Sequence, residues 1–201
     1  MSVLPIYLYG QPVLRKKARP VRAVTAQLLE TVDAMFATMR NAHGIGLAAN
    51  QVGLLERIVV IDISDMEEGQ QVPPLVLLNP EVVDEKGKWV MEEGCLSIPE
   101  IRADVERADS VLVRYRDIDF DEKEITADGL LGRVLLHEID HLNGVLFIDR
   151  IGADVLKTLK GRLNKVSRGE GEIAYPIIAE PIVETRRQGE GIPQKHEGQA
   201  G

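Results

Sequence analysis

The chain has 201 residues, of which 44% are hydrophobic and 28% are charged, and its formal net charge at pH 7 is −8. This balance is that of a folded globular protein and excludes a disordered or membrane-embedded chain. The acidic net charge disfavours a general nucleic-acid binder, which needs a basic surface, and a single cysteine excludes an internal disulfide framework.

The first half of the chain predicts one helix followed by two strands. Thr25 can cap a helix in which apolar residues recur at the helical period as far as Met39, before a glycine-containing loop at 43–46. Residues 57–63 and 75–83 are apolar runs typical of strands. Gly69 and a Pro-Pro pair mark the loop between these strands.

The second half predicts strands first and helices later. The chain is extended from 88 to 90 and turns at Gly94, and residues 101–105 and 110–116 resemble two antiparallel strands. Asp128 is the expected cap of a helix that Gly144 ends, and a last helix runs from about 153 to 168. Its expected buried stripe is Leu156, Leu159, Leu163 and Val166.

The C-terminal part differs in composition from the rest. Residues 172–178 can add a short strand, whereas from Glu184 onward large apolar residues almost vanish and we expect disorder. We therefore expect one domain over residues 1–169 and a C-terminal extension over residues 170–201.

Two histidines one helical turn apart are the strongest chemical signal. Residues 137–141 read His-Glu-Ile-Asp-His, and positions i and i+4 of a helix lie on one face. Both imidazoles can therefore reach one metal ion, and the carboxylate of Glu138 can reach a water bound to it. A buried helix can contain this pattern by chance, so the third ligand decides the interpretation.

The residues alone leave two sources for that third ligand. A metzincin site needs another His where this chain has Phe147, so that arrangement is excluded. A thermolysin-like site would take a downstream acidic residue, here Glu170, Glu172 or Glu180. Cys95 is the other source, although most free cysteines only pack as small apolar side chains. One thiolate and two imidazoles would leave a tetrahedral ion with an open position, which implies catalysis.

Three separated motifs resemble those of the peptide deformylases, the enzymes that remove the N-formyl group from nascent bacterial polypeptides. They are residues 44–51 (GIGLAANQ), 93–97 (EGCLS) and 137–141 (HEIDH), and the similarity spans about residues 4–150. The resemblance implies that Cys95, His137 and His141 are metal ligands. It implies Fe²⁺ as the native ion, with Zn²⁺ or Ni²⁺ able to occupy the same site.

The resemblance also implies a mechanism. Coordination to the metal lowers the pKa of water from ~15.7 towards ~7, and the resulting hydroxide attacks the formyl carbon. Glu138 would act as general base and then as general acid. The side-chain amide of Gln51 and the backbone N–H of Leu96 would stabilise the oxyanion together with the metal.

Members of that family bind formyl-methionyl peptides as an added strand. Gly44 and Gly46 would let the peptide backbone pass close to the protein, and Arg102 either contacts the peptide or is a solvated strand residue. The Met side chain would enter an apolar pocket, whose candidate lining residues, each equally compatible with an ordinary core position, are Ile45, Met91, Leu130 and Val134. The implied fold is α+β, a central metal-binding helix surrounded by antiparallel sheets with an N-terminal and a C-terminal helix.

The last predicted helix is basic within an acidic protein. Residues 153–168 contain five cationic side chains against Asp154 alone, namely Lys157, Lys160, Arg162, Lys165 and Arg168. Such a run is usually a solvated face, but a deformylase meets peptides at the ribosome, so we expect weak, salt-sensitive binding to ribosomal RNA. We expect no binding to DNA or membranes. With no signal-peptide pattern and no membrane span, we expect a cytoplasmic protein.

Two other functions remain open at this point. One is a metallopeptidase that uses a downstream Glu as its third ligand. The other is a non-catalytic, metal-dependent module that recognises peptide N-termini.

Overall fold

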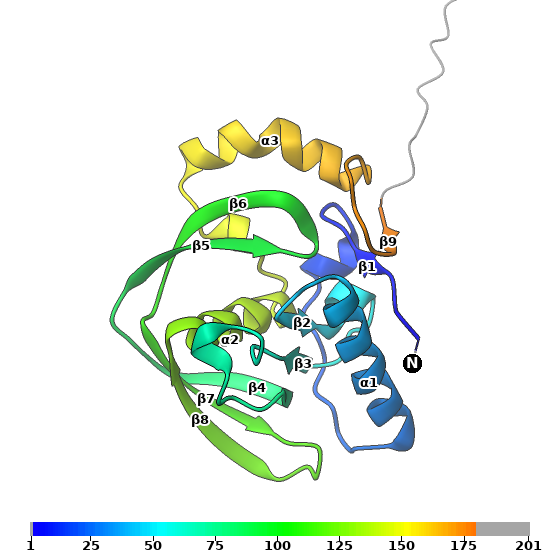
Figure 1. The fold of residues 1–201 in the computed structure, drawn as a ribbon, viewed down its shortest axis with the longest axis vertical. Coiled ribbons are helices and arrows are strands. Elements are labelled where there is room, and N and C mark those ends of the chain that lie inside the picture. The colour runs from blue at the N-terminus through cyan, green and yellow to red at the C-terminus, as the bar shows by residue number, and fades with distance from the viewer. Residues whose placement is uncertain (1, 180–201) are drawn as a thin grey trace, which may run out of the picture.

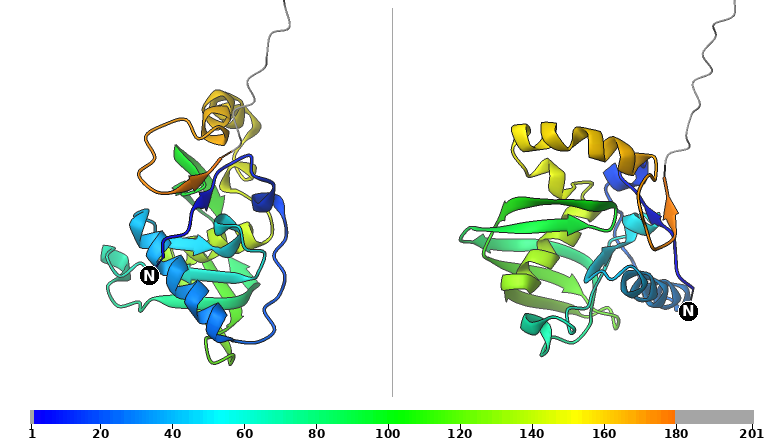
Figure 2. Two further views of the ribbon diagram at one scale, coloured as in Figure 1. Left: turned by 90° about the vertical axis from the view of Figure 1, so that its right-hand side faces the viewer. Right: turned by 45° about the horizontal axis from the view of Figure 1, so that its top comes forward.

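The structure is a computed structural model and describes residues 2–179. Within this range the fold is α+β, as expected, with the helix α2 (Gly129–Leu142) lying between a large and a small antiparallel sheet (Figure 1). The helix α1 (Ala26–Asn41) flanks the large sheet, and α3 (Ala153–Ser167) lies over the small one in both views of Figure 2. None of the helices in residues 2–179 has the length and hydropathy needed to cross a bilayer.

The large sheet has the strand order β2-β3-β4-β7-β8, the small sheet pairs β5 with β6, and a third pair joins β1 to β9 in parallel. The strands are β1 (Ile6–Tyr7), β2 (Gly46–Ala48), β3 (Ile58–Ile61), β4 (Leu75–Lys86), β5 (Trp89–Cys95), β6 (Ile98–Arg107), β7 (Ser110–Arg116), β8 (Glu122–Asp128) and β9 (Ile177–Ile178). Short 3-10 helices occupy Pro12–Arg15, Ala49–Val52, Glu67–Gly69 and Phe147–Asp149.

The two strands expected at 101–105 and 110–116 exist but do not pair with each other. The first lies in β6 and pairs with β5, and the second is β7, which lies between β4 and β8. Alternation along a strand shows which side chains are buried but not which strand is the neighbour. Here the buried side chains of β6 pack in the apolar cluster that includes α3, while those of β7 pack in the cluster that includes α2.

The central helix α2 is buried on nearly every side. Every residue from Gly132 to Leu142 is buried, and the apolar ones pack against β3, β4 and β7. The same stretch carries Arg133, His137, Glu138, Asp140 and His141. Burying this many ionisable groups is costly unless they are paired with each other or with a metal. The central helix therefore carries the side chains best suited to form a metal or catalytic site.

The other two helices cover the core through apolar stripes. Thr25 caps α1 as expected, because its Oγ1 accepts a hydrogen bond from the Leu28 N–H at 3.2 Å. In α3, Leu159, Leu163 and Val166 are buried against β6, but Leu156 is 36% exposed and lies outside the expected stripe. Asp128 occupies the N-cap position of α2 without a side-chain cap.

Gly144 ends α2 in a conformation that favours glycine. Its φ is +77°, and a Cβ there would lie 2.6 Å from the backbone oxygen of Arg15. Gly161, inside α3, is the opposite case, because a Cβ there would meet no atom within 4 Å.

We predict that Gly144→Ala lowers the free energy of unfolding by at least about 2 kcal/mol, since the left-handed conformation alone costs an L-residue ~1–2 kcal/mol and the backbone contact adds to it. Gly161→Ala, the matched control, should raise stability by up to about 1 kcal/mol, the helix-propensity difference between the two residues. Urea denaturation of both variants measures the difference. Equal effects of the two substitutions would contradict this account of the helix end.

Candidate metal centre and substrate cleft

Three potential ligands converge where the end of β5 meets α2. The ligand atoms of Cys95, His137 and His141 all lie within 4.8 Å of one another. The Sγ of Cys95 is 3.2 Å from Nε2 of His141. A thiol and two imidazoles at such distances form a donor set that suits a divalent transition metal, so the residues fit the expected ion.

The orientation of His137 is fixed by a buried carboxylate. Its Nδ1 lies 2.9 Å from Oε2 of Glu93, which leaves Nε2 on the side of the ring away from that carboxylate. Burial lowers the pKa of His137, but hydrogen bonds to Cys95 and Glu93 outweigh burial and raise it to about 10. Burial lowers the pKa of His141 well below its ordinary value. A carboxylate behind a ligating histidine is a common way to set its tautomer and basicity.

Glu93 is itself held by two arginines. The Nε and Nη2 of Arg107 bind its two oxygens at 2.6 and 2.9 Å, and Nη1 of Arg133 binds Oε1 at 2.9 Å. The third nitrogen of Arg107 reaches Asp140 Oδ2 at 2.6 Å, and Arg150 binds the same carboxylate. Burial raises the pKa of Glu93, but hydrogen bonds to His137 and Arg107 outweigh it and hold that pKa well below its usual range. The carboxylate is thus charged and can neutralise its cationic neighbours.

This buried network was not expected from the sequence, although a signal for part of it was present. Along β6 the buried residues alternate as Ala103, Val105 and Arg107, so the arginine occupies an inward position of the strand. On β5, Glu93 is likewise the buried member of an alternating series. A charged residue in the buried phase of two successive strands predicts an internal ion pair.

Glu138 lies beside the ligands in an environment that favours its neutral form. Burial raises its pKa to about 7, and its Oε2 has no hydrogen-bond partner among residues 2–179. The backbone of β2 passes close to it, since a Cβ at Gly46 would lie 2.6 Å from Glu138 Oε1. The carboxyl group is therefore confined, and it can exchange a proton near neutral pH.

The amide of Gln51 also points towards the ligands. Its Oε1 accepts a hydrogen bond from the Ala48 N–H at 2.8 Å, which turns its NH₂ group towards Cys95 Sγ at 3.6 Å and Ser97 Oγ at 3.3 Å. Leu96, the next residue after Cys95, lies at the turn from β5 into β6. One potential donor, the NH₂ group of Gln51, thus lies beside Cys95, and Leu96 directly follows that cysteine in the chain.

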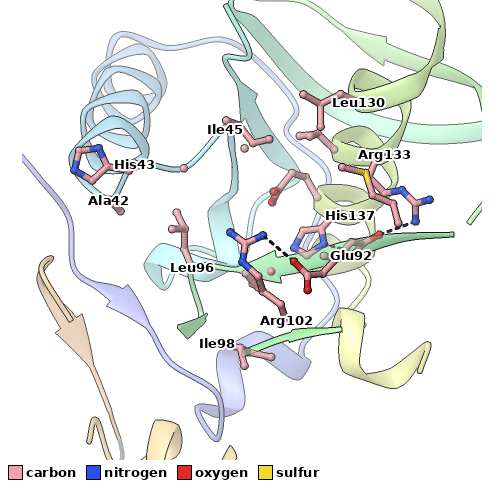
Figure 3. Close-up of a pocket in the computed structure, with 18 of the residues that line it drawn as sticks. Ala42, His43, Ile45, Glu92, Leu96, Ile98, Arg102, Leu130, Arg133 and His137 are labelled. Atoms are coloured by element: carbon pink, nitrogen blue, oxygen red, sulfur yellow. Dashed lines mark hydrogen bonds and ion pairs between the residues drawn. The ribbon is translucent and has the colours of Figure 1, made fainter. Parts of the chain in front are cut away.

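These groups border a pocket of about 540 Å³ (Figure 3). Most of the site residues expected from the sequence line this pocket, namely Gly44, Ile45, Gly46, Gln51, Met91, Cys95, Leu96, Arg102, Leu130, Val134, His137 and Glu138. His141, only 1% exposed, is not among the lining residues. Lining residues that were not expected include His43, Met66 and Arg133.

Arg102 lies at the open side of the pocket. Its side chain is 67% exposed, and its only ion pair within residues 2–179 is a long one, 3.8 Å to Glu92 (Figure 3). An exposed pair of this length contributes little to stability, so the guanidinium is free to bind another group.

The downstream acidic residues do not reach this site. Glu170 and Glu172 are exposed, and Glu170 pairs with Arg168 at 2.6 Å. Glu180 lies outside the described residues, as does the tail for which disorder was expected. Within residues 2–179 the geometry therefore favours Cys95 as the third ligand over Glu170 or Glu172.

Comparison with known sequences identifies close relatives of the chain. A family model described as Polypeptide deformylase matches residues 3–156. A peptide deformylase of Chlorobium luteolum is 44% identical over 189 residues, which cover 94% of this chain and 97% of that protein. One of Salinibacter ruber is 47% identical over 184 residues, covering 88% of this chain and 94% of that protein.

Solved structures share the fold. The crystal structure of a peptide deformylase from Legionella pneumophila superposes with a TM-score of 0.76 and is 39% identical, covering 83% of this chain and 96% of that one. The peptide deformylase from Synechococcus elongatus in complex with actinonin gives a TM-score of 0.72 at 41% identity, covering 87% and 92%. Because these identities extend over most of both chains, the likeness concerns the whole domain.

The network around Glu93 yields a stability prediction. Glu93→Ala should lower the free energy of unfolding of the metal-free protein by about 3–5 kcal/mol, because it takes the anion from the buried guanidinium of Arg133 and leaves that of Arg107 with Asp140 alone. Glu92→Ala, one residue away but with a side chain 61% exposed, should change stability by less than about 0.5 kcal/mol. Urea denaturation compares the two. In addition, Glu93→Ala should weaken metal binding by roughly 10–100-fold. A loss no larger than that of the control would refute the role of this carboxylate.

Proposed function

We propose how this chain, which belongs to the polypeptide deformylase family, carries out the family reaction, the hydrolytic removal of the N-formyl group from newly made polypeptides. The single observation that supports the assignment of roles best is the convergence of Cys95, His137 and His141 next to the buried Glu138.

Cys95, His137 and His141 would hold one divalent ion. A bound ion supplies Lewis acidity, which polarises the formyl carbonyl and acidifies water. We propose Fe²⁺ as the native ion, with Zn²⁺ or Ni²⁺ as substitutes, because a mixed thiolate and imidazole set accepts all of them. Glu93 supports this site by keeping the Nε2 atom of His137 available for coordination.

Glu138 moves the proton in this proposal. In its charged form it accepts a proton from the attacking water, and it then donates that proton to the amine that leaves when the C–N bond of the formamide breaks. A pKa of about 7 places both forms within reach at neutral pH. The products are formate and a peptide with a free N-terminal amine.

Gln51 and Leu96 would stabilise the oxyanion that develops on the formyl oxygen. The Gln51 carbonyl is held by Ala48, so its NH₂ group is the part that faces the pocket. The Leu96 backbone N–H would be the second donor. Fixed donors of this kind need no reorganisation when charge develops, which is why they accelerate the reaction.

The pocket suits a formyl-methionyl N-terminus. Ile45, Met91, Leu130 and Val134 provide apolar lining for an unbranched thioether side chain. Gly44 and Gly46 border the same pocket and would lie along the peptide backbone, while the exposed Arg102 would meet the peptide further along. We propose that the enzyme meets this substrate in the cytoplasm, where a thiolate ligand stays reduced.

Turnover of formyl-Met-Ala by the protein loaded anaerobically with Fe²⁺ tests this function. Glu138→Gln should lower kcat by about 10²–10⁴-fold while metal content stays that of the wild type, because only the proton carrier is lost. Cys95→Ala should lose both metal and activity. Glu122 is an exposed residue on β8, so the control variant Glu122→Gln should keep the metal content and the kcat of the wild type.

The alternatives predict other results in the same assay. A wild type that binds metal and formyl peptide but releases no formate would be a binding module. A Cys95→Ala variant that keeps its metal would point to a metallopeptidase site with another ligand.

We also propose that α3 binds the ribosome. Lys157, Lys160 and Lys165 are exposed and lie outside the buried stripe of this helix. Lys157 pairs with Asp154, whereas Arg162 donates to the backbone carbonyl of Glu100 and is turned towards the protein. A cationic face on an acidic protein would be attracted to RNA phosphate.

Charge reversal of this face at Lys157, Lys160 and Lys165 to Glu should reduce cosedimentation with ribosomes by at least about tenfold at low salt, and added salt should weaken wild-type binding. Reversal of Lys16 and Lys17, exposed lysines outside α3, is the control and should leave most binding intact. If the α3 variant cosediments as well as the wild type does, the helix is not the binding surface.

A further inference from the structure

Residues 170–179 return to the turn between β5 and β6, which contains Leu96. After α3 the chain forms β9, which pairs in parallel with β1 near the N-terminus (Figure 1). The Ile6 N–H donates to the Pro176 carbonyl and the Leu8 N–H to the Ile178 carbonyl, both at 2.9 Å. This segment lies beyond residue 156, where the match to the family model ends. The family model therefore says nothing about a role of residues 170–179 in the site.

Tyr175 connects this segment to the residue after the cysteine ligand. Its hydroxyl lies 2.7 Å from the backbone oxygen of Leu96. A carbonyl oxygen can only accept, so the phenol donates the hydrogen bond. Burial raises the pKa of Tyr175, with a further contribution from the charge of Cys95, so the phenol keeps the proton that it donates.

Other contacts hold the loop on both sides of Leu96. The Tyr9 N–H donates to the Ser97 carbonyl at 2.8 Å, and Cys95 is paired with Ile98 in the β5–β6 hairpin. The Leu96 side chain lies against Gly44, where a Cβ would come within 2.6 Å of its Cδ1 atom. Within residues 2–179, the Tyr175 hydroxyl is the side-chain donor that binds the Leu96 carbonyl.

We propose that Tyr175 is a positioning residue, whose hydrogen bond to the Leu96 carbonyl orients the Leu96 backbone so that its N–H is aimed at the oxyanion. The inference rests on the proposed role of Leu96. The N–H and C=O of one residue are joined through two backbone torsions, so a bond that fixes the carbonyl restricts the direction of the N–H. A donor in an oxyanion hole works only at about 2.7–3.1 Å from the developing charge, so a small rotation reduces its effect.

The test is Tyr175→Phe in the full-length, Fe²⁺-loaded protein with formyl-Met-Ala as substrate. One misaligned hydrogen bond should lower kcat by about 3–10-fold. The KM should stay within about twofold, because the oxyanion contact strengthens only in the transition state. Tyr7→Phe is the matched control, since Tyr7 lies on β1, the strand paired with β9, and its hydroxyl makes no hydrogen bond within residues 2–179. It should keep the wild-type kcat.

A second measurement is independent of activity. Amide hydrogen exchange of the metal-free protein should be faster in residues 94–101 of Tyr175→Phe than in the wild type, and unchanged in Tyr7→Phe. Thermal melting verifies that both variants are folded.

The outcomes separate this inference from the proposed function. A wild type without deformylase activity overturns the proposed function. An active wild type matched in kcat by Tyr175→Phe overturns the positioning role, even if the variant melts at a lower temperature. Unchanged exchange at residues 94–101 overturns it as well, because the loop would then be held without the phenol.

Discussion

The buried carboxylate of Glu93 is the group on which the rest of the site depends. It accepts hydrogen bonds from Arg107 and Arg133 and lies 2.9 Å from Nδ1 of His137, so one anion joins two strands to the central helix and orients the imidazole of a proposed metal ligand. A helix carrying so many ionisable groups can be buried only because this network compensates their charges. The packing of the central helix and the orientation of His137 therefore depend on the same side chain.

Two buried carboxylates in this region differ in pKa because their surroundings differ. Glu93 is surrounded by donors and stays charged, whereas Glu138 is buried with one oxygen unpartnered and has a pKa of about 7. The first has a structural role because it cannot readily take up a proton. The second suits proton transfer because neither form is strongly preferred at neutral pH. Environment, and not residue type, separates their tasks.

Much of the site could be predicted from the sequence because its residues occur in short, local motifs. The i, i+4 spacing of His137 and His141 places both rings on one helix face in any context. The network that supports them is assembled from Glu93, Arg107 and Asp140, which lie on three different elements. The pairing of those elements is not encoded locally, which is also why the sequence does not show that β6 pairs with β5 while β7 pairs with β4 and β8.

The sequence by itself determined the helices, the pair of histidines one turn apart, the acidic residue beside the first His and the family resemblance, since each depends on neighbours along the chain. Only the tertiary structure decided that Cys95 lies within reach of both imidazoles, that Glu93 is internal, and that Tyr175 reaches the Leu96 carbonyl. Each of these contacts joins residues far apart in sequence. Their distances follow from how the sheets and helices pack, and short-range patterns carry no information about that packing.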